Sequence, residues 1–183
     1  MNRIIPLPEA EWTQQQRRVL IDTSPNDEPA SGNWYQALVR HPGLHAKWVA
    51  FGAQLLVKGK LAARDRELLV LRTAWRTGAE YYWDPHVRLA HEAGITPGEI
   101  DAVTDGRNAG AWDDHDRALL NAVDELISDN VISDTTWATL ARSLDERQLI
   151  EVPFLVGHYV MVACTMRSIG VALEPGQGGF EVR

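Results

Sequence analysis

Glu67 is the first of three ionisable side chains that lie on otherwise apolar faces of expected helices. Its carboxylate shares a face with Val70, Leu71 and Ala74, which follow at three, four and seven residues. A carboxyl group held in such surroundings without a partner can serve as a general acid or base. The alternatives are an acid at the helix start or a structural ion pair with Arg64 or Arg72.

His86 lies among apolar and aromatic groups, because its neighbours at three and four residues are Tyr82, Trp83, Leu89 and Ala90. Asp84-Pro85 resembles an N-cap followed by the first helical residue, which places His86 in the first turn. A helix N-terminus favours the neutral imidazole, which can accept a proton. The alternative is a buried histidine bonded to a backbone carbonyl.

His158 is the third candidate, next to a glycine that lets a ligand or another backbone approach closely. Its neighbours on the helix face are apolar: Phe154, Leu155, Met161 and Val162. We interpret His158 as a substrate-binding residue, with a purely structural histidine as the alternative.

Composition excludes several classes of function. Eighteen basic and 25 acidic residues give a net charge of −7, which disfavours binding to nucleic acid or anionic lipid. Cys164, the single cysteine, excludes an internal disulfide and a two-cysteine redox centre, and we expect it to pack on an apolar face. No export signal or long apolar run is evident, so we expect a cytoplasmic protein.

No metal or cofactor site is predicted. Pro42-Gly43 separates His41 from His45, and His86 and His91 are five residues apart and so lie on different helix faces. The Gly-Gln-Gly-Gly segment of the tail lacks the Lys-Ser or Lys-Thr of a phosphate-binding loop.

Apolar spacing predicts an all-α bundle in one domain of residues 1–183, with an N-terminal helix and linker over 1–32 and a tail over 174–183 that is flexible or docked on a neighbour. Only 171–173 shows strand-like alternation. Pro153 should kink the last long helix. The expected helices cover 8–23, 33–39, 44–58, 61–76, 82–93, a segment from 97, 113–129, a segment from 134, and 144–169.

Several motifs together resemble the carboxymuconolactone decarboxylase family, which includes the alkylhydroperoxidase D-like proteins. They are Arg64-Asp65-Arg66-Glu67-Leu68-Leu69-Val70-Leu71-Arg72, Ala79-Glu80-Tyr81-Tyr82-Trp83-Asp84-Pro85-His86, Asn33-Trp34-Tyr35-Gln36-Ala37-Leu38 and Val156-Gly157-His158-Tyr159. The resemblance runs from about residue 30 to 175. It implies an all-helical, oligomeric protein of two, three or six copies.

The peroxidase members of this family carry Cys-x-x-Cys-x-x-x-His with an upstream glutamate. The resemblance places Ala79 and Tyr82 at the two cysteine positions, His86 at the histidine and Glu67 at the glutamate. A thiol peroxidase needs one thiolate to be oxidised and a second thiol to resolve it. We therefore expect this chain to keep the proton relay and to lack peroxidase activity.

Two functions remain. The first is cofactor-free lyase or isomerase chemistry on a small organic acid, lactone or enolisable carbonyl, with His86 and Glu67 catalytic and Glu80, Tyr82, Trp83 and His158 binding the substrate. The second is a non-catalytic oligomeric protein whose aromatic pocket, lined by Tyr81, Tyr82 and Trp83, binds a flat apolar molecule. Arg72, Arg76 and Arg88 are candidates for holding substrate carboxylates.

Overall fold

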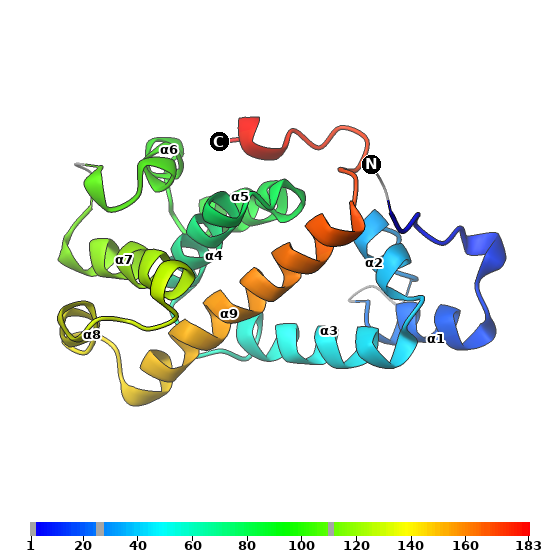
Figure 1. The fold of residues 1–183 in the computed structure, drawn as a ribbon, viewed down its shortest axis with the longest axis horizontal. Helices are drawn as coiled ribbons and strands as arrows, with labels where there is room; N and C mark the ends of the chain where they lie inside the picture. Colours follow the sequence, from blue (N-terminus) through cyan, green and yellow to red (C-terminus); the bar gives the residue numbers. More distant parts are fainter. Residues whose placement is uncertain (1–2, 25–27, 110–111) are drawn as a thin grey trace. The chain divides into compact units, whose positions relative to one another are not determined.

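The computed structural model describes residues 3–24, 28–109 and 112–183 (Figure 1). Regular structure in this part of the chain is helical, which confirms the all-α prediction. The strand-like segment 171–173 is irregular, and the carbonyls of Ala172 and Leu173 accept hydrogen bonds from the Asn33 side chain instead. Of the predicted linker, residues 25–27 lie outside the described residues.

The chain forms two compact units, and the first consists of residues 1–58 and 165–176. It holds the 3-10 turn η1 (Glu9–Glu11) and the helices α1 (Gln14–Asp22), α2 (Asn33–Leu38) and α3 (Pro42–Leu56). Its buried side chains include Leu7, Leu20 and Val39. Helix α1 begins later than predicted because Thr13 and Gln16 form a capping box there.

The second unit consists of residues 59–164 and 177–183. Its helices are α4 (Ala63–Thr77), α5 (Trp83–Glu92), α6 (Pro97–Asp105), α7 (Asp114–Asp129) and α8 (Asp134–Leu140), with the 3-10 turns η2 (Glu80–Tyr82), η3 (Gly106–Asn108) and η4 (Gly179–Glu181). Helix α4 is central, because it packs against α5, α6 and α7 and buries every residue from 67 to 74. It ends at Gly78, whose left-handed conformation closes the last turn.

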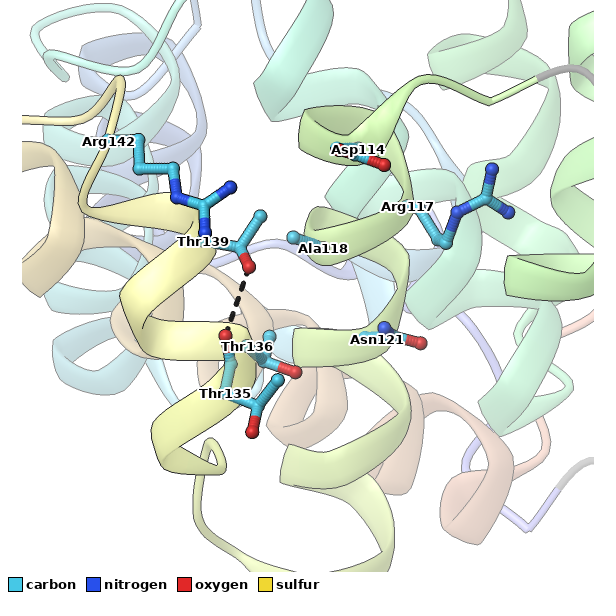
Figure 2. Close-up of a pocket in the computed structure, with 8 residues that line it drawn as sticks. All are labelled: Asp114, Arg117, Ala118, Asn121, Thr135, Thr136, Thr139 and Arg142. Atoms are coloured by element: carbon cyan, nitrogen blue, oxygen red, sulfur yellow. Dashed lines mark hydrogen bonds between the residues drawn. The ribbon is translucent and has the colours of Figure 1, made fainter.

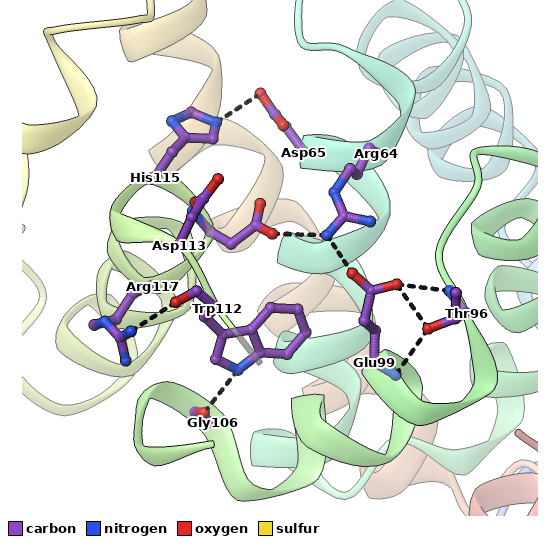
Figure 3. Close-up of polar contacts among 10 residues, drawn as sticks. Arg64, Asp65, Thr96, Glu99, Gly106, Trp112, Asp113, His115 and Arg117 are labelled. Carbon is purple, nitrogen blue, oxygen red and sulfur yellow. Dashed lines mark hydrogen bonds and ion pairs between the residues drawn. The ribbon is translucent and has the colours of Figure 1, made fainter. Parts of the chain in front are cut away.

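A cluster of charged side chains fastens α4 to its neighbours (Figure 3). The Arg64 guanidinium donates to Glu99 of α6 at 2.6 Å and to Asp116 of α7 at 2.7 Å. Glu99 also closes the capping box with Thr96 that the sequence predicts. On the next residue of α4, Asp65 lies 3.2 Å from His115 Nε2. These contacts fix the helix that carries Glu67.

Helix α9 (Glu146–Ile169) runs through Pro153 without ending, and its residues up to Cys164 belong to the second unit. By length and composition alone it could cross a membrane, since an 18-residue window has a mean hydropathy of 1.6. The expectation of no such segment is wrong, because Gly157, His158 and Tyr159 interrupt the run without lowering its average enough. Half of that window is buried in the protein, as in a core helix.

The end of the chain packs on its own second unit, so the prediction of a flexible tail is wrong for residues 177–183. Phe180 lies edge-on to Trp75 and Trp83, with ring centroids 4.9 and 5.2 Å apart. The Trp83 indole N–H donates to the carbonyl of Val182 at 2.8 Å. Aromatic burial and satisfied hydrogen bonds therefore order this segment. Cys164, expected to pack, is exposed instead.

Candidate active site

Glu67 is fully buried on α4, and both of its carboxylate oxygens are hydrogen-bonded. The Nε of Arg66, the preceding residue, donates to Oε1 at 2.8 Å. Neither suggested partner reaches Glu67: Arg64 bonds Glu99 and Asp116, and Arg72 bonds Asp124. A buried carboxylate with a guanidinium on one oxygen keeps the other oxygen for a second donor.

His86 supplies that second donor from the first turn of α5. Its Nδ1 lies 2.6 Å from Glu67 Oε2, and the side chain keeps only 7% of its exposure. The helix begins at Trp83, so Asp84 is not the predicted N-cap; its carboxylate accepts a hydrogen bond from the Gly178 amide instead. With the carboxylate as acceptor, Nδ1 carries the proton and Nε2 is the basic nitrogen.

Tyr159 meets that basic nitrogen and was not predicted as a site residue. Its hydroxyl lies 2.8 Å from His86 Nε2, and the two rings cross at 87° with centroids 5.1 Å apart. The sequence does contain a signal. Positions 152, 155, 159, 162 and 166 are spaced three and four apart and form a buried face of α9, which contains Tyr159. The structure therefore contains a continuous chain, Arg66–Glu67–His86–Tyr159, which we call the relay.

The four predicted substrate-binding residues lie in different surroundings. Tyr82 packs edge-on to Tyr159 at 5.0 Å, and its hydroxyl donates a long, 3.4 Å hydrogen bond to the Tyr159 carbonyl. His158 is adjacent to Tyr159 in the chain and is buried. Trp83 packs in the aromatic cluster of the tail, and Glu80 is exposed. Of the four, Tyr82 and His158 have rings that lie against the relay.

Burial controls the charge of the groups around Tyr159. It lowers the pKa of His158 to about 4, so this imidazole is neutral at pH 7. Burial also raises the pKa of Tyr82 well above its usual range, so its phenol keeps its proton. The relay thus ends among uncharged rings, where electrostatic interactions are weakly screened.

The arginines suggested as carboxylate ligands are engaged elsewhere or exposed. Arg72 is buried and donates to both oxygens of Asp124 and to the carbonyls of Val103 and Thr104. Arg76 also bonds Asp124, and Arg88 lies on the surface. Arg66 is therefore the guanidinium closest to the chemistry, and it serves Glu67.

A cavity of about 230 Å³ lies away from the relay, between α7 and α8 (Figure 2). Its lining is polar: Asp114, Arg117, Ala118, Asn121, Thr135, Thr136, Thr139 and Arg142. Two of the threonines are occupied by the protein itself, since Thr139 donates to the Thr135 carbonyl and Thr136 donates to Glu125. None of the relay residues lines this cavity.

Solved structures share this fold at low sequence identity. An alkylhydroperoxidase AhpD core protein from Ralstonia eutropha JMP134, described as peroxidase-related, superposes with a TM-score of 0.76 at 16% identity and covers 94% of this chain and 92% of its own. A peroxidase-related protein from Silicibacter sp. TM1040 gives 0.72 at 13%, covering 96% and 91%. The debrominase Bmp8, solved with 2,3,4-tribromopyrrole, gives 0.70 at 13%, covering 93% and 91%.

No curated protein sequence matches the chain at a significant level. The model of the carboxymuconolactone decarboxylase family matches residues 42–125, a segment that contains Glu67 and His86. That match, together with the fold shared with alkylhydroperoxidase D-like proteins, assigns the chain to the carboxymuconolactone decarboxylase family.

Proposed function

We propose that this protein is a cofactor-free acid–base enzyme, a lyase or isomerase acting on a small organic acid, lactone or enolisable carbonyl. One observation carries the proposal: His86 joins the buried Glu67 carboxylate on one side to a phenol on the other, at 2.6 and 2.8 Å. An imidazole between a carboxylate and a second proton-bearing group can take up and return a proton within a single site. Proton transfer at an activated carbon requires no electron carrier.

The residues at the former cysteine positions support non-thiol chemistry. Ala79 is buried and carries no reactive group, and Tyr82 places a ring where the resemblance puts the second cysteine. Cys164 has no second cysteine to resolve it, since the sequence contains one. The thiol peroxidase reaction is therefore not part of the proposal.

Hydrogen exchange at carbon provides the test. The protein is incubated in D₂O with α-angelica lactone, a β,γ-unsaturated lactone, and separately with levulinate, an enolisable keto acid; ¹H NMR follows deuterium uptake and isomerisation. We expect exchange above the buffer rate for at least one probe and a return to the buffer rate in His86→Gln. Equal rates in the protein and the buffer for both probes, or equal rates in the wild type and His86→Gln, would contradict the proposal.

The closure of the relay favours a second candidate, a non-catalytic small-molecule-binding protein. Glu67, His86 and Tyr159 are all more than nine-tenths buried, as in a polar network that fastens three helices together. The fold accommodates a flat halogenated ring in Bmp8, and flat apolar ligands suit the aromatic side chains of this unit. Saturable binding of such a ligand without any exchange in D₂O would select this second function.

We also propose that the protein is a cytoplasmic homo-oligomer. Helix α9 leaves Ile150, Phe154 and Met161 about half exposed, and apolar side chains gathered on a surface are typical of subunit interfaces. Light scattering coupled to gel filtration measures the assembly directly. A monomeric mass at micromolar concentration would contradict this part of the proposal.

A further inference from the structure

We propose that the phenol of Tyr159 is the group that exchanges protons with the substrate, and that His86 and Glu67 act through it. This inference rests on the acid–base function proposed above and adds the residue that touches the substrate. The argument begins with the nitrogens of His86. Nδ1 lies 2.6 Å from Glu67 and Nε2 lies 2.8 Å from the Tyr159 hydroxyl, so each ring nitrogen has a hydrogen-bond partner in the protein.

The two ends of the relay differ in what they can offer a substrate. At one end, Glu67 is fully buried and its second oxygen accepts from Arg66. At the other end, the Tyr159 oxygen donates one hydrogen bond to His86 and keeps lone pairs that can accept another. A proton from outside the relay can therefore enter at the phenol without breaking the contacts of Glu67 or His86.

Three aromatic rings hold Tyr159 in place. The rings of Tyr82, His86 and His158 lie 5.0, 5.1 and 5.4 Å from it, each at a steep angle. Edge-to-face contacts of this kind restrict rotation of the phenol and keep its hydroxyl directed at Nε2. Since His158 and Tyr82 are both uncharged at pH 7, the charge that develops on Tyr159 meets only the relay.

The proton balance of the step is closed. In the resting state Tyr159 bears its O–H proton, His86 is protonated on Nδ1, and Glu67 is a carboxylate. The Tyr159 oxygen takes a proton from the carbon next to the substrate carbonyl while its own proton passes to His86 Nε2. The C–H electron pair becomes the enolate π system, and the imidazolium forms beside the Glu67 carboxylate.

In the second half, the enolate takes the phenol proton at the same or another carbon, and His86 returns its proton to Tyr159. No electron leaves the substrate and no co-reactant is consumed. The net result is hydrogen exchange or isomerisation. Among the proposed substrate classes, this mechanism selects an enolisable carbonyl or unsaturated lactone.

The test compares four proteins with α-angelica lactone in D₂O: wild type, Tyr159→Phe, His86→Gln and Tyr35→Phe. Tyr35 lies in the first unit, so its variant controls for loss of a buried phenol. We expect Tyr159→Phe to slow exchange about a hundredfold or more, as loss of a general acid or base does, with unchanged circular dichroism. Tyr35→Phe should stay within twofold of wild type.

A pH profile separates a proton-transferring phenol from a structural one. With 3-fluorotyrosine at position 159, whose phenol is more acidic, the limb of the profile set by the phenol should move to lower pH; the same replacement at position 35 should leave it in place. If Tyr159→Phe keeps the wild-type rate while His86→Gln loses it, the acid–base function stands and the role of Tyr159 is wrong. If the wild type exchanges only at the buffer rate, the proposed function fails and this inference fails with it.

Discussion

Replacing Glu67 by glutamine should destabilise the protein by about 2–4 kcal/mol. The carboxylate is fully buried and accepts one hydrogen bond from Arg66 and one from His86, at 2.8 and 2.6 Å. The amide has the same shape but only one accepting oxygen, so its NH₂ group faces a donor and one of the two contacts is lost. A hydrogen bond to a charged group contributes about 1.5–3 kcal/mol, and a buried donor left unsatisfied adds about 1–3 kcal/mol.

Urea unfolding followed by tryptophan fluorescence measures this loss. Glu80→Gln is the matched control, because the same substitution at an exposed position should change the free energy of unfolding by less than about 0.5 kcal/mol. A Glu67→Gln variant no less stable than Glu80→Gln would refute the argument, since it would mean that the buried carboxylate contributes nothing to the folded state.

A double-mutant cycle tests whether the relay acts as one network. Tyr159→Phe removes the hydroxyl bonded to His86 and keeps the ring. If Glu67 and Tyr159 act through the same imidazole, the free energies of Glu67→Gln and Tyr159→Phe should fail to add by about 0.5–3 kcal/mol. Additivity within measurement error would show two independent contacts.

Three further outcomes follow from the second unit. Although partial burial alone would raise it, hydrogen bonds from a guanidinium and from a capping threonine hold the pKa of Glu99 at about 2, so its contribution to stability is present above pH 4.5 and lost as the pH falls towards 2; Glu99→Gln should flatten acid unfolding over that range. The hydrogen bond to Asp65 raises the pKa of His115, so its contribution is complete below about pH 6.5 and is lost as the pH rises through the folded value; in urea unfolding, wild type should exceed His115→Asn more at pH 5.5 than at pH 8. Gly106→Ala should cost about 1–3 kcal/mol by thermal unfolding, since Gly106 has φ of +69° and a Cβ there would meet the Arg72 guanidinium; an unchanged melting temperature would contradict it.

Helix positions are readable from this sequence because caps and breakers are local. Ser133 caps α8 and Gly78 ends α4 where the residue types predict. The tail could not be read in this way. Phe180 and Val182 are ordered by Trp83, almost a hundred residues earlier, and local spacing contains no information about such a pairing.

The site shows the same division between local and long-range information. Helical spacing put Glu67 and His86 on apolar faces, and the structure brings these two residues together. Spacing also placed both His158 and Tyr159 in the α9 sequence, but the ionisable imidazole drew the prediction and the phenol did not. Which of two adjacent residues points at His86 depends on how α9 is rotated against α5, and that rotation is set by packing of the whole unit.

The relay also has a consequence for the order in which the protein is made. Its members stand 19 and 73 residues apart along the chain, so the ribosome delivers Glu67 and His86 well before Tyr159. Until α9 emerges, the nascent polypeptide holds an imidazole and a carboxylate with no phenol to cover them. Contacts of such long separation form late, so the proton-handling centre is among the last features of the newborn chain to mature.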